Sequence, residues 1–209
     1  MPSSTFLNLD KKKQDLFLKV AFQEFSAHDY NSASISEMVR TLNIAKGSVY
    51  QYFENKEDLF FYLVDRSFHE KMNFISDEMG TNKTFVSWFR NRQLILLDFE
   101  KKKAMYSKLL ANFYLQKNNP DLRKKYLDLK NREMSFVQES LDKLSSTLRK
   151  KDDLPLLSYL ILEWENALGD YPEITEGKKL SNKAKSAYDS EQIIDNFAEM
   201  LSKGITKGK

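Results

Sequence analysis

Residues 44–60 read IAKGSVYQYFENKEDLF, and this stretch decides how the rest of the chain is interpreted. Gly47 lies one residue inside what looks like a two-turn helix, and two tyrosines and a glutamine follow it. A helix that only filled a hydrophobic core would carry leucine and alanine, because both have high helix propensity and no polar groups. The composition therefore indicates that one face of this short helix has a role outside the core.

Two helices are predicted on the N-terminal side of this stretch. The first runs from about Lys11 to Ala27 and repeats apolar residues at helical spacing: Leu18, Ala21, Phe22 and Phe25. The second begins after Ser34, which we expect to form a capping box with Glu37. Its buried stripe is Ile35, Met38, Val39 and Leu42. Asn43 ends this helix because asparagine tolerates the left-handed conformation of a sharp turn.

The turn Leu42-Asn43-Ile44-Ala45 joins the second helix to a third at about 46–53, which makes a helix-turn-helix. Val49 and Phe53 form the apolar side that fixes the third helix against the first two. The opposite side carries donor groups with the reach that a helix in a major groove requires. These residues are Lys46, Gly47, Ser48, Tyr50, Gln51 and Tyr52.

Each of these side chains has a predicted role in such an interface. Lys46, Tyr50 and Tyr52 can bond to phosphates, whereas Gln51 can pair with a base edge. Gly47 lets backbone amides of the first turn come close to a phosphate. The alternative for both tyrosines is a role as core aromatics.

Two further residues beside this helix are candidates for phosphate contact. Lys56 opens the next helix, where its charge and the free amides both favour an anion. The alternative is ordinary solvated charge beside Glu57 and Asp58 at a capped helix start, with Asn55 as the cap. Ser34 already has a capping role, so a phosphate bond there would be additional.

The remaining chain is predicted to be helical. A long fourth helix places Phe60, Val64, Phe68, Met72, Ile75 and Met79 on one stripe, and GTNKT at 80–84 breaks it. Further helices are expected at about 84–100, 103–117, 120–149, 155–168 and 188–206, with Pro120 and Pro155 in first turns. The helix from 120 carries the stripe Leu127, Met134, Val137, Leu141, Leu144 and Leu148. Residues 169–183 are expected to form the longest loop.

The composition fits this all-α interpretation and excludes several classes of function. Apolar residues make up 41% of the 209 positions, and six glycines with four prolines are too few for a β protein rich in tight turns. The absence of cysteine excludes disulfides, thiolate zinc sites and cysteine nucleophiles. Because His28 and His69 are far apart and no phosphate loop or spaced carboxylate pair occurs, we expect no metal, no cofactor and no enzymatic activity.

Charge and hydropathy give weaker indications about partners. The net charge is +3, but residues 1–60 hold seven basic and eight acidic side chains, so bulk charge alone does not indicate nucleic-acid binding. The N-terminus lacks the apolar core of a signal peptide. The apolar run at 154–164 is shorter than the roughly 20 residues that span a bilayer. We therefore expect a cytoplasmic protein with no membrane partner.

Residues 17–64 resemble the N-terminal domain of the TetR family of transcriptional regulators (TetR/AcrR type). The resemblance rests on FLKVAFQEF, SISEMV and above all on Lys-Gly-Ser-x-Tyr-x-x-Phe-x-x-Lys-Glu-x-Leu at 46–59. Asp29 and Asn43 stand where family members usually have glycine, and both residue types tolerate positive φ. Ala45 replaces the Ser or Thr that often opens the recognition helix, so Ala45 itself is assigned no DNA contact.

The resemblance implies a two-part architecture. A three-helix DNA-binding domain at 1–65, with its motif at about 34–53, would be joined by the long helix to a larger helical domain at 66–209. The larger domain would bind a small hydrophobic effector in a pocket with aromatic walls, for which the candidates are Trp88, Phe89, Tyr106, Phe113, Tyr126 and Trp164. It would also form a homodimer through a four-helix bundle, with Trp164, Leu168, Ile194, Phe197 and Leu201 at the seam.

As the resemblance implies, the protein is a regulator, most simply a repressor, whose dimer binds a palindromic operator in double-stranded DNA. The effector would push the long fourth helix, change the separation of the recognition helices and release the DNA. An alternative is a helical sensor or carrier of small molecules that has the same fold but weak or lost specific DNA binding. The non-basic N-terminal part makes this alternative conceivable.

Overall fold

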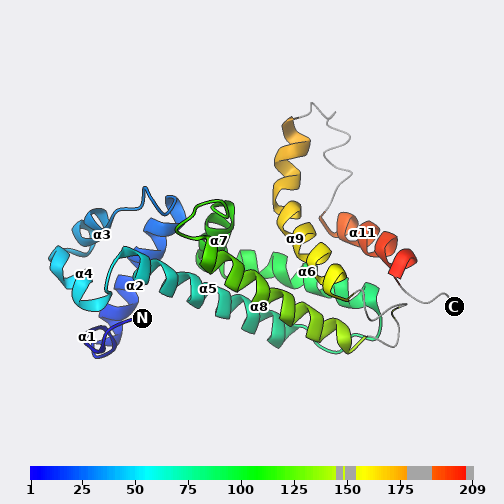
Figure 1. The fold of residues 1–209 in the computed structure, drawn as a ribbon, viewed down its shortest axis with the longest axis horizontal. Helices are drawn as coiled ribbons and strands as arrows, with labels where there is room; N and C mark the ends of the chain where they lie inside the picture. Colours follow the sequence, from blue (N-terminus) through cyan, green and yellow to red (C-terminus); the bar gives the residue numbers. More distant parts are fainter. Residues whose placement is uncertain (145–147, 149–153, 178–189, 206–209) are drawn as a thin grey trace. The chain divides into compact units, whose positions relative to one another are not determined.

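A computed structural model describes residues 1–144, 148, 154–177 and 190–205, and for 166–177, 190 and 204–205 it describes the backbone alone. Helices make up almost all of this described chain, which confirms the all-α prediction (Figure 1). They are α1 (Ser4–Leu7), α2 (Lys11–Ala27), α3 (Ile35–Leu42), α4 (Lys46–Tyr52), α5 (Lys56–Glu78), α6 (Phe85–Lys102), α7 (Ala104–Leu115), α8 (Arg123–Asp142), α9 (Leu154–Gly177) and α11 (Ser190–Ile205). Within these ranges, no helix has the length and apolar character needed to cross a membrane.

The chain packs as two compact units. The N-terminal unit comprises Met1–Phe74 and Asp98–Leu129, and the C-terminal unit comprises Ile75–Leu97 and Lys130–Lys209. Helices α5, α6 and α8 therefore each contribute residues to both units. The predicted boundary at residue 65 divides the chain by function, into a DNA-binding and an effector-binding domain, and it stays a prediction.

Aromatic side chains fill the core of the N-terminal unit. The predicted stripes of α2 and α3 supply Phe22, Phe25 and Met38, all essentially inaccessible to solvent. Helix α1, which the sequence did not predict, adds Phe6, whose ring centroid lies 5.5 Å from that of Phe17 and 5.2 Å from that of Phe53. A four-residue helix is too short to show periodicity, so its burial could only be seen in three dimensions.

The C-terminal unit has its own core, built on α6, α8, α9 and α11. Phe85 and Phe89 of α6 are fully buried, and the rings of Phe89, Trp164 and Phe197 contact one another, with the last two stacked at a centroid distance of 4.5 Å. Other buried members of this cluster are Trp88, Val137, Leu141, Leu144, Leu148, Leu157, Ile161, Leu162, Ile194 and Ala198. Each unit can thus bury apolar surface by itself.

Three predicted boundaries are wrong. Helix α8 begins at Arg123 and ends at Asp142, so Pro120 lies in the preceding turn rather than in a first helical turn. Its buried face includes Leu129 and Glu133, whereas Leu127 is 45% exposed. The predicted stripe counted only apolar residues and therefore left out the buried Glu133. Residues 169–177 belong to helix α9 instead of a loop, and 178–183 lie outside the described chain.

Candidate DNA-binding surface

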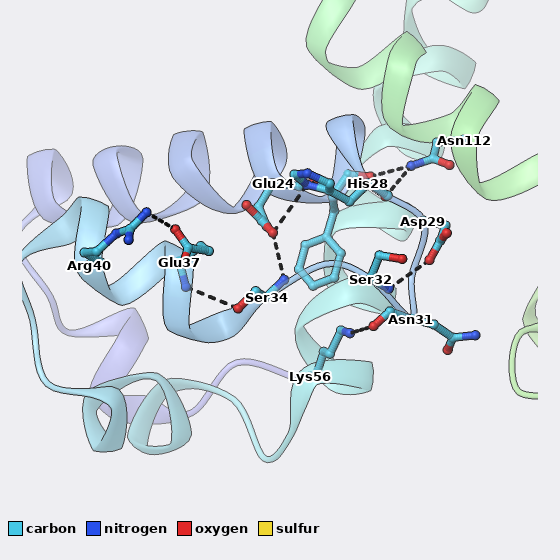
Figure 2. A network of polar contacts seen from close by, with 11 residues as sticks. Glu24, His28, Asp29, Asn31, Ser32, Ser34, Glu37, Arg40, Lys56 and Asn112 are labelled. Carbon is cyan, nitrogen blue, oxygen red and sulfur yellow. Dashed lines mark hydrogen bonds and ion pairs between the residues drawn. The ribbon is translucent and has the colours of Figure 1, made fainter.

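The N-cap residue of helix α3, Ser34, makes hydrogen bonds to residues of both α2 and α3. The Ser34 hydroxyl accepts a hydrogen bond from the Glu37 amide at 3.3 Å, as predicted. Between these described residues the reciprocal bond of a capping box does not form, because the Ser34 amide donates instead to Glu24 Oε1 of α2 at 2.7 Å (Figure 2). Glu37 pairs instead with Arg40, one turn further along α3. The second half of the predicted capping box is therefore wrong, and α2 supplies the missing acceptor.

The turn between α2 and α3 is stabilised by Asp29. Its carboxylate accepts a hydrogen bond from the Ser32 amide at 2.8 Å, and this bond holds the pKa of the exposed Asp29 below its ordinary value. Of the non-glycine residues that the structure describes, only Asn43 has positive φ, so Asp29 does not replace glycine by adopting that conformation. Instead, the hydrogen bond from the Ser32 amide to the Asp29 side chain stabilises the turn.

The turn between α3 and α4 agrees with the prediction from the sequence. Asn43 adopts the left-handed conformation at φ 52° and ψ 46°, and the Ile44 amide donates to the carbonyl of Val39 at 3.1 Å. Ala45 is the N-cap of α4 and gives it no side-chain hydrogen bond. Val49 and Phe53 are buried as predicted, which fixes α4 with its opposite side outward.

The N-terminal segment holds the far end of α4. The Ser3 amide donates to the carbonyl of Tyr52 at 2.8 Å, and the Ser3 hydroxyl donates to the carbonyl of Gln51 at 2.5 Å. These carbonyls have no partner inside the helix, because they lie in its last turn. The segment before α2 thus stabilises the C-terminal end of the candidate recognition helix.

The predicted contact residues of α4 differ in exposure. Lys46, Gly47 and Gln51 are exposed, and Tyr50 is 48% exposed, so the core alternative does not hold for Tyr50. Ser48 and Tyr52 are half-buried. The Tyr52 ring packs against those of Phe6 and Phe17, at 5.7 and 5.5 Å, so its structural role is real.

Gly47 has no packing reason to be glycine. A Cβ atom added there would meet no other atom within 4 Å, and its φ is not in the left-handed region. Glycine in a helix costs about 0.5–1 kcal/mol relative to alanine. The packing of this chain therefore does not require glycine at this position.

Lys56 is less free than the sequence implied. Its Nζ donates to the carbonyl of Asn31 at 3.1 Å (Figure 2). The same nitrogen lies 4.9 Å from the centre of the Tyr30 ring. Partial burial lowers the pKa of Lys56, with Asp29 and Glu24 acting in the opposite direction. Asn55 caps α5 through a 2.8 Å bond from the Asp58 amide, as predicted. Lys56 thus fastens the α2–α3 turn to the start of α5.

Asn112 of α7 and Gln116, the C-cap of that helix, make three hydrogen bonds that the sequence did not reveal. The side-chain amide of Asn112 donates to the carbonyls of Phe25 and His28, at 2.8 and 2.6 Å (Figure 2). Gln116 Oε1 accepts a hydrogen bond from the Tyr30 amide at 2.8 Å. These partners lie 84 to 87 positions apart in the chain, so no local pattern could have paired them. Together they hold the end of α2 and the turn that leads into the helix-turn-helix.

The predicted pocket residues fall into both compact units. Tyr106, Phe113 and Tyr126 belong to the N-terminal unit, where the Tyr106 ring packs edge-on against Phe22 at 5.1 Å. Trp88, Phe89 and Trp164 belong to the C-terminal unit. The structure thus assigns the six candidates to two cores. Among the described side chains, no group of histidine and carboxylate ligands could hold a metal ion.

The predicted dimer residues also occupy different environments. Ile194 is fully buried inside its own chain, and Trp164, Phe197 and Leu201 are half-buried. Leu168 belongs to α9, but its side chain lies outside the described residues. Among the described side chains of α9 and α11, the large apolar ones that are exposed, which the prediction missed, are Leu156, Tyr159, Leu160 and Met200.

A short helix with one buried face, a turn through left-handed Asn43 and a second helix with an outward polar face define a helix-turn-helix. Residues 17–63 match the family described as bacterial regulatory proteins, tetR family. This match identifies residues 17–63 as the N-terminal domain of the tetR family.

Curated relatives match mainly through the N-terminal part. The chain is 27% identical over 118 residues to the HTH-type dhaKLM operon transcriptional activator DhaS of Lactococcus lactis subsp. lactis (strain IL1403), an alignment that covers 56% of this chain and 58% of DhaS. It is 34% identical over 67 residues to the HTH-type transcriptional regulator YuxN of Bacillus subtilis (strain 168), covering 30% of this chain and 23% of YuxN. The chain therefore spans between about a quarter and just over half the length of these relatives.

Solved structures match over the whole chain. A TetR family transcriptional regulator from Chloroflexus aurantiacus J-10-FL is 20% identical, has a TM-score of 0.73 and covers all of both chains. The fatty acid degradation regulator FadR from Bacillus halodurans is 16% identical, has a TM-score of 0.66 and covers 93% of this chain and 96% of its own. At these identities the likeness establishes the fold.

Proposed function

We propose that this regulator binds a palindromic operator as a homodimer, acts as a repressor and is released by a small hydrophobic effector. The observation that carries the DNA-binding part is the outward face of α4, where Gly47 stands in open space beside exposed Lys46, Tyr50 and Gln51. A glycine that the fold itself does not require fits close approach of a phosphate to backbone amides.

The side chains of α4 divide by their reach and chemistry. Lys46 and Tyr50 would bond to phosphates and position the helix, while Gln51 would read a base edge in the major groove. Ser48 and Tyr52 are half-buried, so their hydroxyl groups would add phosphate bonds at the rim of the contact. Ser34, at the start of α3, would contribute its hydroxyl in the same way while it keeps its capping bond.

Lys56 would bind a phosphate without releasing the turn that it holds. An ammonium group has three donors. One donates to the carbonyl of Asn31, which leaves two for phosphate oxygens. The contact would therefore be sensitive to any change that moves the α2–α3 turn.

A second copy of the chain would cover the exposed apolar residues of α9 and α11. Leu156, Tyr159 and Leu160 are spaced i, i+3, i+4 and therefore share one face of α9. An isologous two-fold contact buries such a stripe and presents two recognition helices to the two halves of a palindrome. This seam places Leu156, Tyr159, Leu160 and Met200 beside the half-buried Trp164, Phe197 and Leu201, with Ile194 behind them in the core.

The effector part of the proposal has one thermodynamic requirement. A ligand of the domain at 66–209 must bind the released arrangement of the dimer better than the DNA-bound one, because equal affinities shift no equilibrium. DhaS is named as an activator, so this relative has the opposite sign of regulation from the repressor that we propose.

Selection of genomic fragments by the purified protein at about physiological salt tests the proposal. We expect one palindrome to be enriched, and Lys46→Ala should weaken its binding while lowering the slope of log K against log salt by about one. Gln51→Ala should instead reduce the preference for the palindrome over other sequences. Lys108→Ala, a change at an exposed lysine of α7, serves as the matched control and should alter neither property. Enrichment of no shared sequence would favour the sensor or carrier alternative.

A further inference from the structure

The core of the C-terminal unit contains a charged cluster. Arg92 of α6 is 0% exposed, and its guanidinium binds both oxygens of Glu165 on α9, with Nε–Oε1 at 2.7 Å and Nη2–Oε2 at 3.1 Å. Gln93 donates to the same carboxylate at 2.9 Å. Glu133 of α8 is also buried, and its carboxylate lies 3.6 Å from the ammonium of Lys130. The Arg92–Glu165 ion pair joins α6 to α9, and the four charged side chains named here, two basic and two acidic, balance one another.

Two donors of this core have no acceptor. Nη1 of Arg92 and Nε1 of Trp88 are fully shielded from solvent, and neither has a hydrogen-bond partner in the part of the chain that the structure describes. Trp88 is itself only 3% exposed. Buried donors in native proteins are nearly always paired, so each orphaned donor calls for an explanation. Here the two occur together.

The two donors belong to one face of one helix. Trp88 and Arg92 are four positions apart on α6, a spacing that brings side chains to neighbouring places on the helix surface. A carbonyl oxygen has two lone pairs and can accept from two donors at once. One acceptor oxygen can therefore serve two donors of neighbouring side chains.

The surroundings select the kind of molecule that would carry this oxygen. The cluster already balances Arg92 and Lys130 against Glu133 and Glu165, so an anion would add a buried charge without a counterion. The rest of the core is apolar and aromatic, with Phe85, Phe89 and Trp164 among its members. A neutral acceptor on an otherwise apolar molecule meets both conditions.

We propose that Trp88 and Arg92 form a recognition site for the carbonyl oxygen of a neutral, largely apolar ligand. The proposal rests on the effector-binding part of the proposed function and narrows its ligand class. The ligand would accept hydrogen bonds from Nε1 of Trp88 and Nη1 of Arg92, while Glu165 and Gln93 hold the guanidinium in place. Arg92 is thereby both a structural ion-pair partner and a ligand contact.

Three small aromatic probes of nearly equal shape test this site. Acetophenone carries a carbonyl, α-methylstyrene has a CH₂ group in place of that oxygen, and benzoate carries a negative charge. Indole N–H resonances of the ¹⁵N-labelled full chain report directly, because it has only two tryptophans and Trp164→Phe assigns the signal of Trp88. We expect acetophenone to shift the Trp88 signal and to bind about tenfold more tightly than either other probe.

A conservative variant separates hydrogen bonding from packing. Trp88→Phe keeps an aromatic ring but removes the donor, so it should abolish the preference for acetophenone over α-methylstyrene. Equal affinities for those two probes in the wild-type chain, or no binding of acetophenone, would overturn the proposal. A long-lived water hydrogen-bonded to the Trp88 indole and not displaced by acetophenone would also overturn it, because water would then be the missing acceptor.

These measurements use the protein without DNA, so they do not depend on operator binding. If the chain selects no palindrome but acetophenone binds as expected, the ligand site stands and the regulatory proposal fails. If a palindrome is selected and released by other molecules while acetophenone fails to bind, the proposed ligand class fails and the regulatory proposal stands.

Discussion

The two compact units differ in where their networks of charged side chains lie. In the N-terminal unit the core is built from aromatic and aliphatic groups, and the polar network of Glu24, Asp29, Lys56 and Asn112 lies at half-exposed turns (Figure 2). The core of the C-terminal unit contains charged side chains, and the buried charged residues that the structure describes, Arg92 and Glu133, both belong to this unit. The first arrangement positions backbone for an outside partner, and the second ties helices together from within.

This difference predicts how strongly each network is coupled. A hydrogen bond at a solvent-accessible turn exchanges with water, so losing one contact costs little. A buried charge that loses its counterion has no such substitute. Substitutions in the C-terminal cluster should therefore have large and non-additive effects, whereas those in the N-terminal network should be small and nearly independent.

The largest expected effect is that of Arg92→Leu. Removal of the guanidinium leaves the carboxylate of Glu165 buried without its partner, which should lower the free energy of unfolding by about 3–5 kcal/mol. The double variant Arg92→Leu/Glu165→Leu should recover much of that loss, because neither charge is then left alone. Urea unfolding measures all three proteins.

The matched control for this prediction lies two positions away on α6, on a more exposed side of the helix. Arg90 binds Asp195 at 2.7 Å and Glu191 at 3.1 Å, but its side chain is 37% exposed. Arg90→Leu should cost no more than about 1 kcal/mol, as is usual for surface ion pairs. Equal losses for Arg90→Leu and Arg92→Leu would contradict the contrast between buried and exposed charge.

Asn112→Ala should have an intermediate effect on the N-terminal unit. The change removes two hydrogen bonds to the carbonyls of Phe25 and His28 and should cost about 1–2 kcal/mol. Hydrogen exchange of the Tyr30 and Ser34 amides should accelerate, because α7 no longer holds the turn between them. Operator affinity should fall in parallel.

Asn118→Ala, at an exposed position just after α7, is the control for Asn112→Ala and should leave exchange in the turn unchanged. If the Tyr30 and Ser34 amides exchange equally in both variants, the contacts from α7 do not position the turn.

A gain of stability is expected from Ala45→Ser. Ala45 is the N-cap of α4 and provides no side-chain acceptor, whereas serine would accept from an amide of the first turn. The free energy of unfolding should rise by roughly 0.5–1 kcal/mol in thermal or urea unfolding. Ala111→Ser, an exposed position within α7, is the control and should be slightly destabilising, because serine lowers helix propensity there. A loss of stability in Ala45→Ser would show that the N-cap is not limiting.

Local signals explain which parts of the fold could be predicted from the sequence. The bounds of α2 match the predicted Lys11–Ala27, and the turn at Asn43 has the predicted left-handed conformation. Both depend on residues within one or two helical turns of each other, namely an apolar repeat and a helix-ending asparagine. The family motif is equally local, which is why it was recognisable.

The remaining features depend on contacts between distant segments. Glu24 replaces Glu37 as the partner of the Ser34 amide, and Asn112 reaches Phe25 from far along the chain. The burial of Arg92 and Glu133 was not predicted, and Leu127 was placed on the buried stripe of α8 although it is 45% exposed. A single sequence carries no signal for a buried ion pair until the helices that form it are placed.

The smallest expected effect is that of Asp29→Asn, which separates geometry from charge in the α2–α3 turn. The hydrogen bond from the Ser32 amide lowers the pKa of Asp29 in the folded chain below its ordinary value of 3.8. A depressed pKa contributes stability that is present above the unfolded pKa and lost as pH falls through the folded one. Since asparagine keeps an acceptor oxygen but does not titrate, the difference in unfolding midpoint between wild type and Asp29→Asn should be flat above about pH 4 and change only below it.

Because Asp29 is fully exposed, water screens the charge and the pH-dependent part should be small beside the effect of Asn112→Ala. Asp29→Ala is the control, since it removes the acceptor at every pH and should destabilise the turn across the whole range. Carboxyl ¹³C shifts followed from pH 2 to 6 measure the pKa of Asp29 directly. A pKa of Asp29 at or above 3.8 would mean that the Ser32 bond does not favour the charged form of the carboxylate. The backbone alone would then hold this turn, where family members usually have glycine.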